Sequence, residues 1–179
     1  AAAFDQSTLD VSAAAVADLF ESVGLEARVV SDGGSRPAVI AERRSSGDTP
    51  SVLLYAHHDV QPAGDPALWD QDDPFEPIER DGRLYGRGTA DDKAGVVAHV
   101  GALRILGEDL PATVRCFIEG EEEVGSPSFR PFLEANAASL VADTIVVLDS
   151  SNWKVGVPAV TTTLRGLAEA RVTVRVADH

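Results

Sequence analysis

Apolar and polar positions follow two different periods along this chain. Over residues 7–23, apolar side chains recur every three or four positions, which predicts an amphipathic helix that Gly24 ends. The segments 91–106 and 128–140 are also predicted to be helices. Short apolar runs lie between the helices and predict strands. The predicted strands are residues 25–30, 38–42, 51–56, 113–118 and 144–148.

Three of these predicted strands, 51–56, 113–118 and 144–148, are almost continuously apolar. Such strands are typical of a sheet that is covered on both faces. Helices and strands that alternate along a chain indicate an α/β fold. We therefore expect a three-layer α/β/α domain in which these strands and residues 38–42 share one central sheet.

The pattern changes in two other regions. Residues 61–83 are rich in proline and aspartate and are predicted to form a long loop, which in a compact domain is usually functional or mobile. The segments 161–163 and 168–176 are predicted to be late strands, and the second alternates apolar with polar positions, which indicates one face in water. This change predicts a first domain over residues 1–165 and a second that begins with residues 166–179.

Composition and charge disfavour several classes of protein. The 179 residues carry a formal net charge of −14, which disfavours nucleic acid as a partner because its phosphates would be repelled. No apolar run approaches the roughly 18 residues of a membrane span. The lone cysteine, Cys116, cannot form an intrachain disulfide, which fits a reducing, cytoplasmic compartment. The chain begins at Ala1 rather than at methionine, so a processed start is compatible with the sequence.

Carboxylate and imidazole side chains directly follow the predicted strands or open a helix behind one. Because side chains beyond the carboxyl ends of strands converge on one crevice in an open α/β sheet, we expect these clusters to meet. A histidine and several carboxylates in one crevice make an oxygen-rich metal site with room for two ions. The clusters are residues 57–59, 91–92 and 121–123, with Asp149.

The first cluster is His57-His58-Asp59. Side chains at the end of a strand alternate between its two faces, so His57 and Asp59 should point one way and His58 the other. A ligating histidine usually donates its second ring N–H to a carboxylate or a carbonyl group, and Asp59 fits that role. The alternative is a set of ordinary polar residues at a junction between a strand and a loop.

The second cluster, Asp91 and Asp92, follows the glycine-containing run 86–88. A phosphate-binding glycine turn is disfavoured, because Asp91 takes the place of the third glycine and two carboxylates would repel an anion. A structural role for both acids stays open, since acidic residues at a helix N-terminus contribute about 0.3–1 kcal/mol each.

The third cluster, Glu121-Glu122-Glu123, places like charges side by side after a predicted strand. Such charges repel one another and raise the pKa of their neighbours. A bound cation would offset the repulsion and leave one carboxylate with a raised pKa, which suits a general base. Asp149 ends the strand 144–148 in the same manner.

Three runs together resemble the co-catalytic zinc aminoacylase/carboxypeptidase family. That family includes acetylornithine deacetylase, succinyl-diaminopimelate desuccinylase, glutamate carboxypeptidase and the carnosinase-like dipeptidases. The runs are AHHDVQP at 56–62, LYGRGTADDK at 84–93 and EGEEEVGS at 119–126. The resemblance extends over about residues 51–166, and Trp69 is among the residues that look most like the dipeptidase branch.

The resemblance implies which residues would hold metal. His57 and Asp149 would ligate a first ion, Asp91 would bridge both ions, and Glu123 would ligate the second. The ions would be two Zn²⁺, with Mn²⁺ or Co²⁺ as possible replacements. The resemblance also implies a cis peptide bond between Asp91 and Asp92.

It further implies the roles of two other acidic residues. Glu122 would be the general base, and Asp59 would orient the metal-binding histidine. The glutamate register follows from Val124-Gly125, because the family places its two glutamates directly before a residue and a glycine; Glu121 is then the extra acid.

The implied reaction is metal-dependent hydrolysis of an amide or peptide bond in a small substrate, a dipeptide. The alternatives are an N-acyl amino-acid deacylase or desuccinylase of the same family, or a metal-binding domain without catalysis. The family has an α+β lid domain that usually mediates homodimerisation. We expect the second-metal histidine and the lid histidine to lie beyond His179, so that this chain is the first half of the catalytic domain with the start of the lid.

Overall fold

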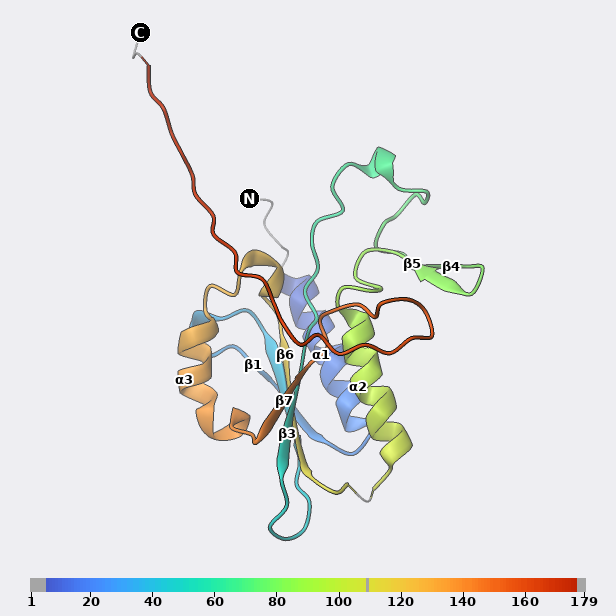
Figure 1. Cartoon of the computed structure of the whole chain (residues 1–179), viewed down its shortest axis with the longest axis vertical. Coiled ribbons are helices and arrows are strands. Elements are labelled where there is room, and N and C mark those ends of the chain that lie inside the picture. Colours follow the sequence, from blue (N-terminus) through green and yellow to red (C-terminus); the bar gives the residue numbers. More distant parts are fainter. Residues whose placement is uncertain (1–5, 109, 177–179) are drawn as a thin grey trace. The chain divides into compact units, whose positions relative to one another are not determined.

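The computed structural model describes residues 6–108 and 110–176. These residues form two compact units that divide between Asp149 and Ser150. All the α-helices and paired strands of the described residues belong to the first unit (Figure 1). None of these helices combines the length with the apolar character that a membrane span needs.

A five-stranded mixed sheet forms the centre of the first unit, in the order β1-β2-β6-β3-β7. Strands β1, β2 and β6 are antiparallel neighbours, whereas β6, β3 and β7 run parallel. This sheet confirms the prediction that the four segments near residues 38–42, 51–56, 113–118 and 144–148 lie together. The bounds are β1 Glu26–Val30, β2 Ala38–Arg43, β3 Ser51–His57, β6 Thr113–Glu119 and β7 Thr144–Val147.

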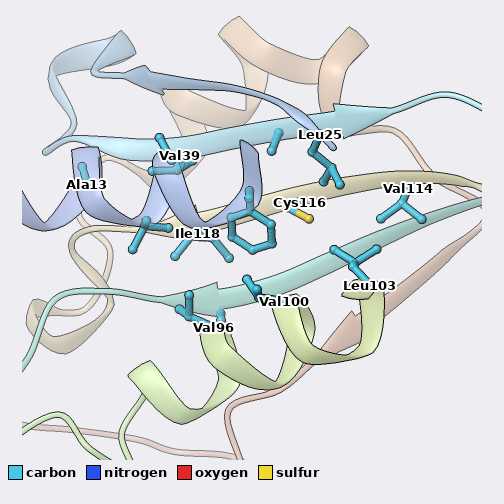
Figure 2. Packing of buried hydrophobic residues seen from close by; sticks show 14 of the residues in the cluster. Ala13, Leu25, Val39, Val96, Val100, Leu103, Val114, Cys116 and Ile118 are labelled. Carbon is cyan, nitrogen blue, oxygen red and sulfur yellow. The ribbon is translucent and has the colours of Figure 1, made fainter. Parts of the chain in front are cut away.

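Helices cover both faces of the sheet, as the α/β/α prediction required. One face packs against α1 (Gln6–Glu21) and α2 (Lys93–Leu106), and the other packs against α3 (Phe129–Leu140). Figure 2 shows side chains of the hydrophobic core between the sheet and helices α1 and α2, with Ala13 from α1 and Leu103 from α2 near apolar strand residues. Alternation along β2 and β6 divides the strand residues between the two cores, because neighbouring side chains point to opposite faces.

The strand β7 differs from its prediction. It was expected to be buried on both faces, but Ile145 is 62% exposed and Val147 is 58% exposed. The reason is its position: β7 pairs with β3 on one side and is the last strand of the described sheet. The apolar run therefore predicted a strand correctly, but its burial on both faces incorrectly.

The predicted loop at residues 61–83 contains structure of its own. A short 3-10 helix at Pro66–Leu68 is followed by a hairpin of β4 (Ile78–Arg80) and β5 (Arg83–Tyr85). Asp81 and Gly82 form the two-residue turn with φ angles of 51° and 69°. An Asp-Gly pair favours this kind of hairpin turn, because both central residues need positive φ.

The second unit contains one isolated bridge, between Lys154 and Val157, and no paired strand among its described residues. Residues 161–163 and 168–176 are therefore not strands here, in contrast to the prediction. A strand needs a partner for its backbone hydrogen bonds, and no described segment supplies one. The domain boundary between residues 165 and 166 stays a prediction, and His179 lies outside the described residues.

Candidate metal centre

The candidate site lies at the carboxyl ends of the parallel strands. His57 is the last residue of β3 and pairs in register with Glu119, the last residue of β6. Asp149 follows the end of β7, and a one-turn 3-10 helix, Glu122–Val124, follows β6. Parallel strands end at the same edge of a sheet, so these segments of distant sequence meet there.

The ring of His57 is the centre of this cluster. Its Nε2 atom lies 3.0 Å from Oδ1 of Asp91, 3.9 Å from Oε2 of Glu122 and 3.9 Å from Oδ1 of Asp149. The His57 side chain is fully buried, whereas the three acids are partly exposed. The structure thus brings three acids of the predicted site within 3.9 Å of one ring nitrogen of His57.

Asp59 lies behind His57, as the predicted orienting role requires. The Nδ1 atom of His57 lies 3.0 Å from the main-chain carbonyl oxygen of Asp59 and 3.5 Å from its carboxylate. The same carboxylate accepts the backbone N–H groups of Glu122 at 3.2 Å and of Glu123 at 3.1 Å. These contacts leave Nε2 of His57 as the ring nitrogen that faces the carboxylates.

This surrounding stabilises positive charge at the His57 ring. Burial alone would lower the pKa of His57, but the hydrogen bond and the charge of Asp59, with a contribution from Asp149, raise that pKa to about 10. A pocket of carboxylates that holds a proton on imidazole this firmly is also suited to a metal cation, which takes the proton's place.

The three consecutive glutamates have different surroundings. Glu123 has its carboxylate near His57 and Asp91, within a group whose ligand atoms all lie within 4.8 Å of one another. Glu121 is buried and turned elsewhere: its carboxylate accepts the backbone N–H of Ser128 at 2.7 Å. The assignment of Glu121 as the extra acid stays a prediction.

Glu122 faces His57 without being part of either group of possible metal ligands among the described residues. Partial burial is the largest cause that raises the pKa of Glu122, and the nearby carboxylates of Asp149 and Glu123 raise it further. The charge of His57 acts in the opposite direction. A carboxylate that has a raised pKa and faces the cluster is suited to accept and return a proton.

His58 points away from this cluster, as the alternation of side chains predicted. Its Nε2 atom lies 2.8 Å from the carbonyl oxygen of Pro37, and its Nδ1 atom lies 3.1 Å from the hydroxyl of Ser12. Burial lowers the pKa of His58, which keeps the ring neutral. His58 is therefore a core residue that is satisfied by hydrogen bonds.

Asp92 makes contacts to the site that the sequence did not indicate. Its carboxylate accepts the N–H of Gly95, which caps α2, and also the backbone N–H of His57 at 3.2 Å. Burial is the main cause that raises the pKa of Asp92 to about 6. The bond between Asp91 and Asp92 is cis, as the family resemblance implied.

The donor atoms suit divalent zinc. Two groups of side chains place their ligand atoms within 4.8 Å of one another, and the groups share the histidine. Imidazole nitrogen and carboxylate oxygen are both ordinary zinc ligands, at bond lengths of about 2.0–2.2 Å. The first group is His57, Asp92 and Asp149, and the second is His57, Asp91 and Glu123. The residues present therefore fit a metal centre.

Sequence reasoning missed one further residue of this centre. Gln61 donates hydrogen bonds to Glu123 from both its backbone and its side chain. The available signal was its position two residues after Asp59, which places both side chains on one side of an extended segment.

Comparison with known proteins agrees with the geometry. Residues 53–178 match the model of peptidase family M20/M25/M40. The chain is 40% identical over 154 residues to the cysteinylglycine-S-conjugate dipeptidase of Corynebacterium striatum, with 84% of this chain and 34% of that protein covered. It is 42% identical over 80 residues to a succinyl-diaminopimelate desuccinylase of Caulobacter sp. (strain K31), with 45% and 20% covered.

The fold is also found among solved structures. The crystal structure of human carnosine dipeptidase 1 matches with a TM-score of 0.70 and 34% sequence identity, over 79% of this chain and 33% of that one. The chain thus spans about a third of the length of this structure and of the Corynebacterium dipeptidase. By its matched residues, its fold and its cluster of metal-ligand side chains, the chain belongs to peptidase family M20/M25/M40.

Proposed function

We propose that the whole protein hydrolyses the peptide bond of a dipeptide with the help of two divalent metal ions. The observation that carries this proposal is the cluster around His57, in which Asp91, Glu122 and Asp149 lie 3.0 to 3.9 Å from one ring nitrogen. The similarity to a cysteinylglycine-S-conjugate dipeptidase and to a carnosine dipeptidase supports a dipeptide as substrate.

The proposed ligands divide between two ions. His57 and Asp149 would hold the first ion, Glu123 would hold the second, and Asp91 would contact both. Two zinc ions fit these donors best, with manganese or cobalt as replacements, since imidazole and carboxylate also suit those metals. When bound, such ions polarise the scissile carbonyl and lower the pKa of a water molecule towards 7.

The remaining proposed steps belong to side chains of this chain. Glu122 takes a proton from the attacking water and later delivers it to the leaving amine, so it acts first as a base and then as an acid. Asp59 keeps His57 in one orientation by occupying its Nδ1 side. Glu122 is free for proton transfer because Glu123, and not Glu122, lies in a group of possible ligands among the residues that the structure describes.

An N-acyl amino-acid substrate is the second candidate. The match to a succinyl-diaminopimelate desuccinylase supports it, although that match covers fewer residues than the dipeptidase match. Both reactions cleave an amide and need the same metal centre, so the difference lies in what binds the substrate ends. We also expect a homodimer in the cytoplasm.

Substrate panels on the whole protein test the proposal. Protein stripped of metal with a chelator should be inactive, and zinc should restore hydrolysis of cysteinylglycine or β-alanyl-histidine. Faster cleavage of N-succinyl amino acids than of any dipeptide would favour the desuccinylase. Zinc binding without hydrolysis of either class would leave a metal-binding domain without catalysis.

A further inference from the structure

Gln61 holds Glu123 at three points. The backbone N–H of Gln61 donates to Oε1 of Glu123 at 3.2 Å, and the side-chain amide donates to Oε2 at 2.8 Å. The same amide also donates to the main-chain carbonyl oxygen of Glu123 at 2.7 Å. Both carboxylate oxygens and the backbone of one glutamate are thus bound by a single residue.

We infer that Gln61 is a positioning residue, which fixes the carboxylate of Glu123 in the orientation that ligates the second metal ion. This inference rests on the proposed function, because it assigns a role toward an ion of the same centre. It adds a residue that makes no proposed bond to metal or substrate and acts only through Glu123.

The local backbone explains why such a residue is useful. Glu123 lies in the single turn Glu122–Val124, which ends at Gly125 in the left-handed conformation. A turn this short gives a long side chain little support, and ordering a flexible glutamate side chain costs conformational entropy. Contacts that order the carboxylate in advance remove this cost from metal binding.

The two segments join at a second point. The carboxylate of Asp59 accepts the backbone N–H of Glu123 at 3.1 Å. Asp59 and Gln61 are two positions apart, so the segment after β3 holds Glu123 at its N–H, at its carbonyl oxygen and at its carboxylate. The position of the proposed second-metal ligand therefore depends on the segment that directly follows His57.

The chemistry of the amide is compatible with a bound cation. Each carboxylate oxygen has two acceptor positions, and Gln61 uses one on each oxygen of Glu123. One position on each oxygen is left for a metal ion. A lysine or arginine in place of Gln61 would neutralise the carboxylate and repel the ion, whereas a neutral amide orients it without competing charge.

Cobalt titration of the whole protein, followed by the visible absorption of bound Co²⁺, tests the inference. Gln61→Met keeps the length of the side chain but removes its N–H donors. We expect the weaker of two binding steps to lose about 10- to 100-fold in affinity, which is typical when the partner of a metal ligand is removed. The tighter step should keep its wild-type affinity.

Gln71→Met is the matched control. The side-chain amide of Gln71 donates to the carbonyl oxygens of Asp73 and Glu76, within the loop that precedes the hairpin. This variant should titrate like the wild type in both steps. Thermal unfolding of both metal-free variants should stay close to that of the wild type, which separates positioning from general damage.

The possible results separate the role of Gln61 from the proposed function. Two wild-type binding steps, with the weaker one selectively lost in Gln61→Met, support the inference. If the wild type shows two binding steps and Gln61→Met leaves both unchanged, or weakens both equally, Gln61 does not position Glu123. The proposed function would still stand. A wild-type protein that binds no pair of ions overturns the proposed function itself.

Discussion

Asp59 and Glu122 are joined by a hydrogen bond of 3.2 Å from the backbone N–H of Glu122 to the Asp59 carboxylate. The same carboxylate lies 3.5 Å from the ring of His57. The Asp59 carboxylate therefore connects His57, a proposed metal ligand, with the turn that carries Glu122, the proposed base. The family resemblance implies only the contact with the histidine, and the structure adds the second.

Asp59→Asn should damage both connections. Asparagine has the same shape, but its NH₂ group would face one of two backbone N–H donors, from Glu122 or Glu123, that now point at carboxylate oxygens. A buried donor without an acceptor costs about 1–3 kcal/mol. We expect a loss of that size in denaturant unfolding, together with a 10- to 100-fold weaker zinc affinity. Wild-type values for both quantities would contradict the role of Asp59.

Glu122→Gln should separate metal binding from turnover. The amide has nearly the shape of the carboxylate, and Glu122 is not a proposed ligand, so zinc content by mass spectrometry should not change. Loss of a general base should lower kcat by about 10²- to 10⁴-fold. Glu134→Gln serves as a control, because Glu134 is an exposed partner of Arg130 on α3 and should leave kcat unchanged. Undiminished kcat in Glu122→Gln would rule out this residue as the base.

Two glycines of α2 should respond in opposite ways to alanine. A Cβ atom at Gly95 would overlap the carbonyl oxygen of Leu148 and the carboxylate of Asp92, whereas one at Gly101 would enter open space. Gly95→Ala should thus destabilise the protein by about 1–3 kcal/mol. Gly101→Ala should stabilise it by about 0.5–1 kcal/mol, as expected in the interior of a helix. Equal effects in chemical unfolding would show that α2 does not pack so closely against the end of β7.

The sequence predicts features that depend on neighbouring residues better than features that depend on residues far apart in the chain. The opposite directions of His57 and His58 follow from the two-residue period of a strand, so local reasoning was sufficient. The exposure of Ile145 depends on which strand lies beside β7, which its own apolar run does not encode. The contact between Gln61 and Glu123 joins residues 62 positions apart, and only the fold brings them together.

His99 provides a test of pH dependence away from the metal ligands. Its Nε2 atom lies 3.0 Å from the carbonyl oxygen of Tyr55, and burial lowers the pKa of the ring. The unfolded chain, in which the pKa is about 6.5, then binds more protons than the folded protein does. The contribution of neutral His99 is complete above that pH and is lost as the pH falls towards the lowered folded value.

The stability difference between wild type and His99→Gln should therefore depend on pH. The variant has no ring to protonate, so its deficit at pH 7.5 should shrink by up to about 1.4 kcal/mol at pH 5.5. Urea unfolding at the two pH values measures this, and taking the difference removes the titration of all other groups. A deficit that stays constant or grows at pH 5.5 would contradict a neutral, buried His99.

Anomalous diffraction at the zinc edge, from crystals of the zinc-loaded whole protein, would locate the proposed pair of metal ions. Two peaks are expected about 3.5–4 Å apart, the usual spacing of paired catalytic ions. One peak should lie at about 2.0–2.2 Å from His57 and Asp149, the other equally close to Glu123, with Asp91 bonded to both. Zinc bound elsewhere, or a centre that leaves out His57 or Asp91, would rule out the proposed two-metal site.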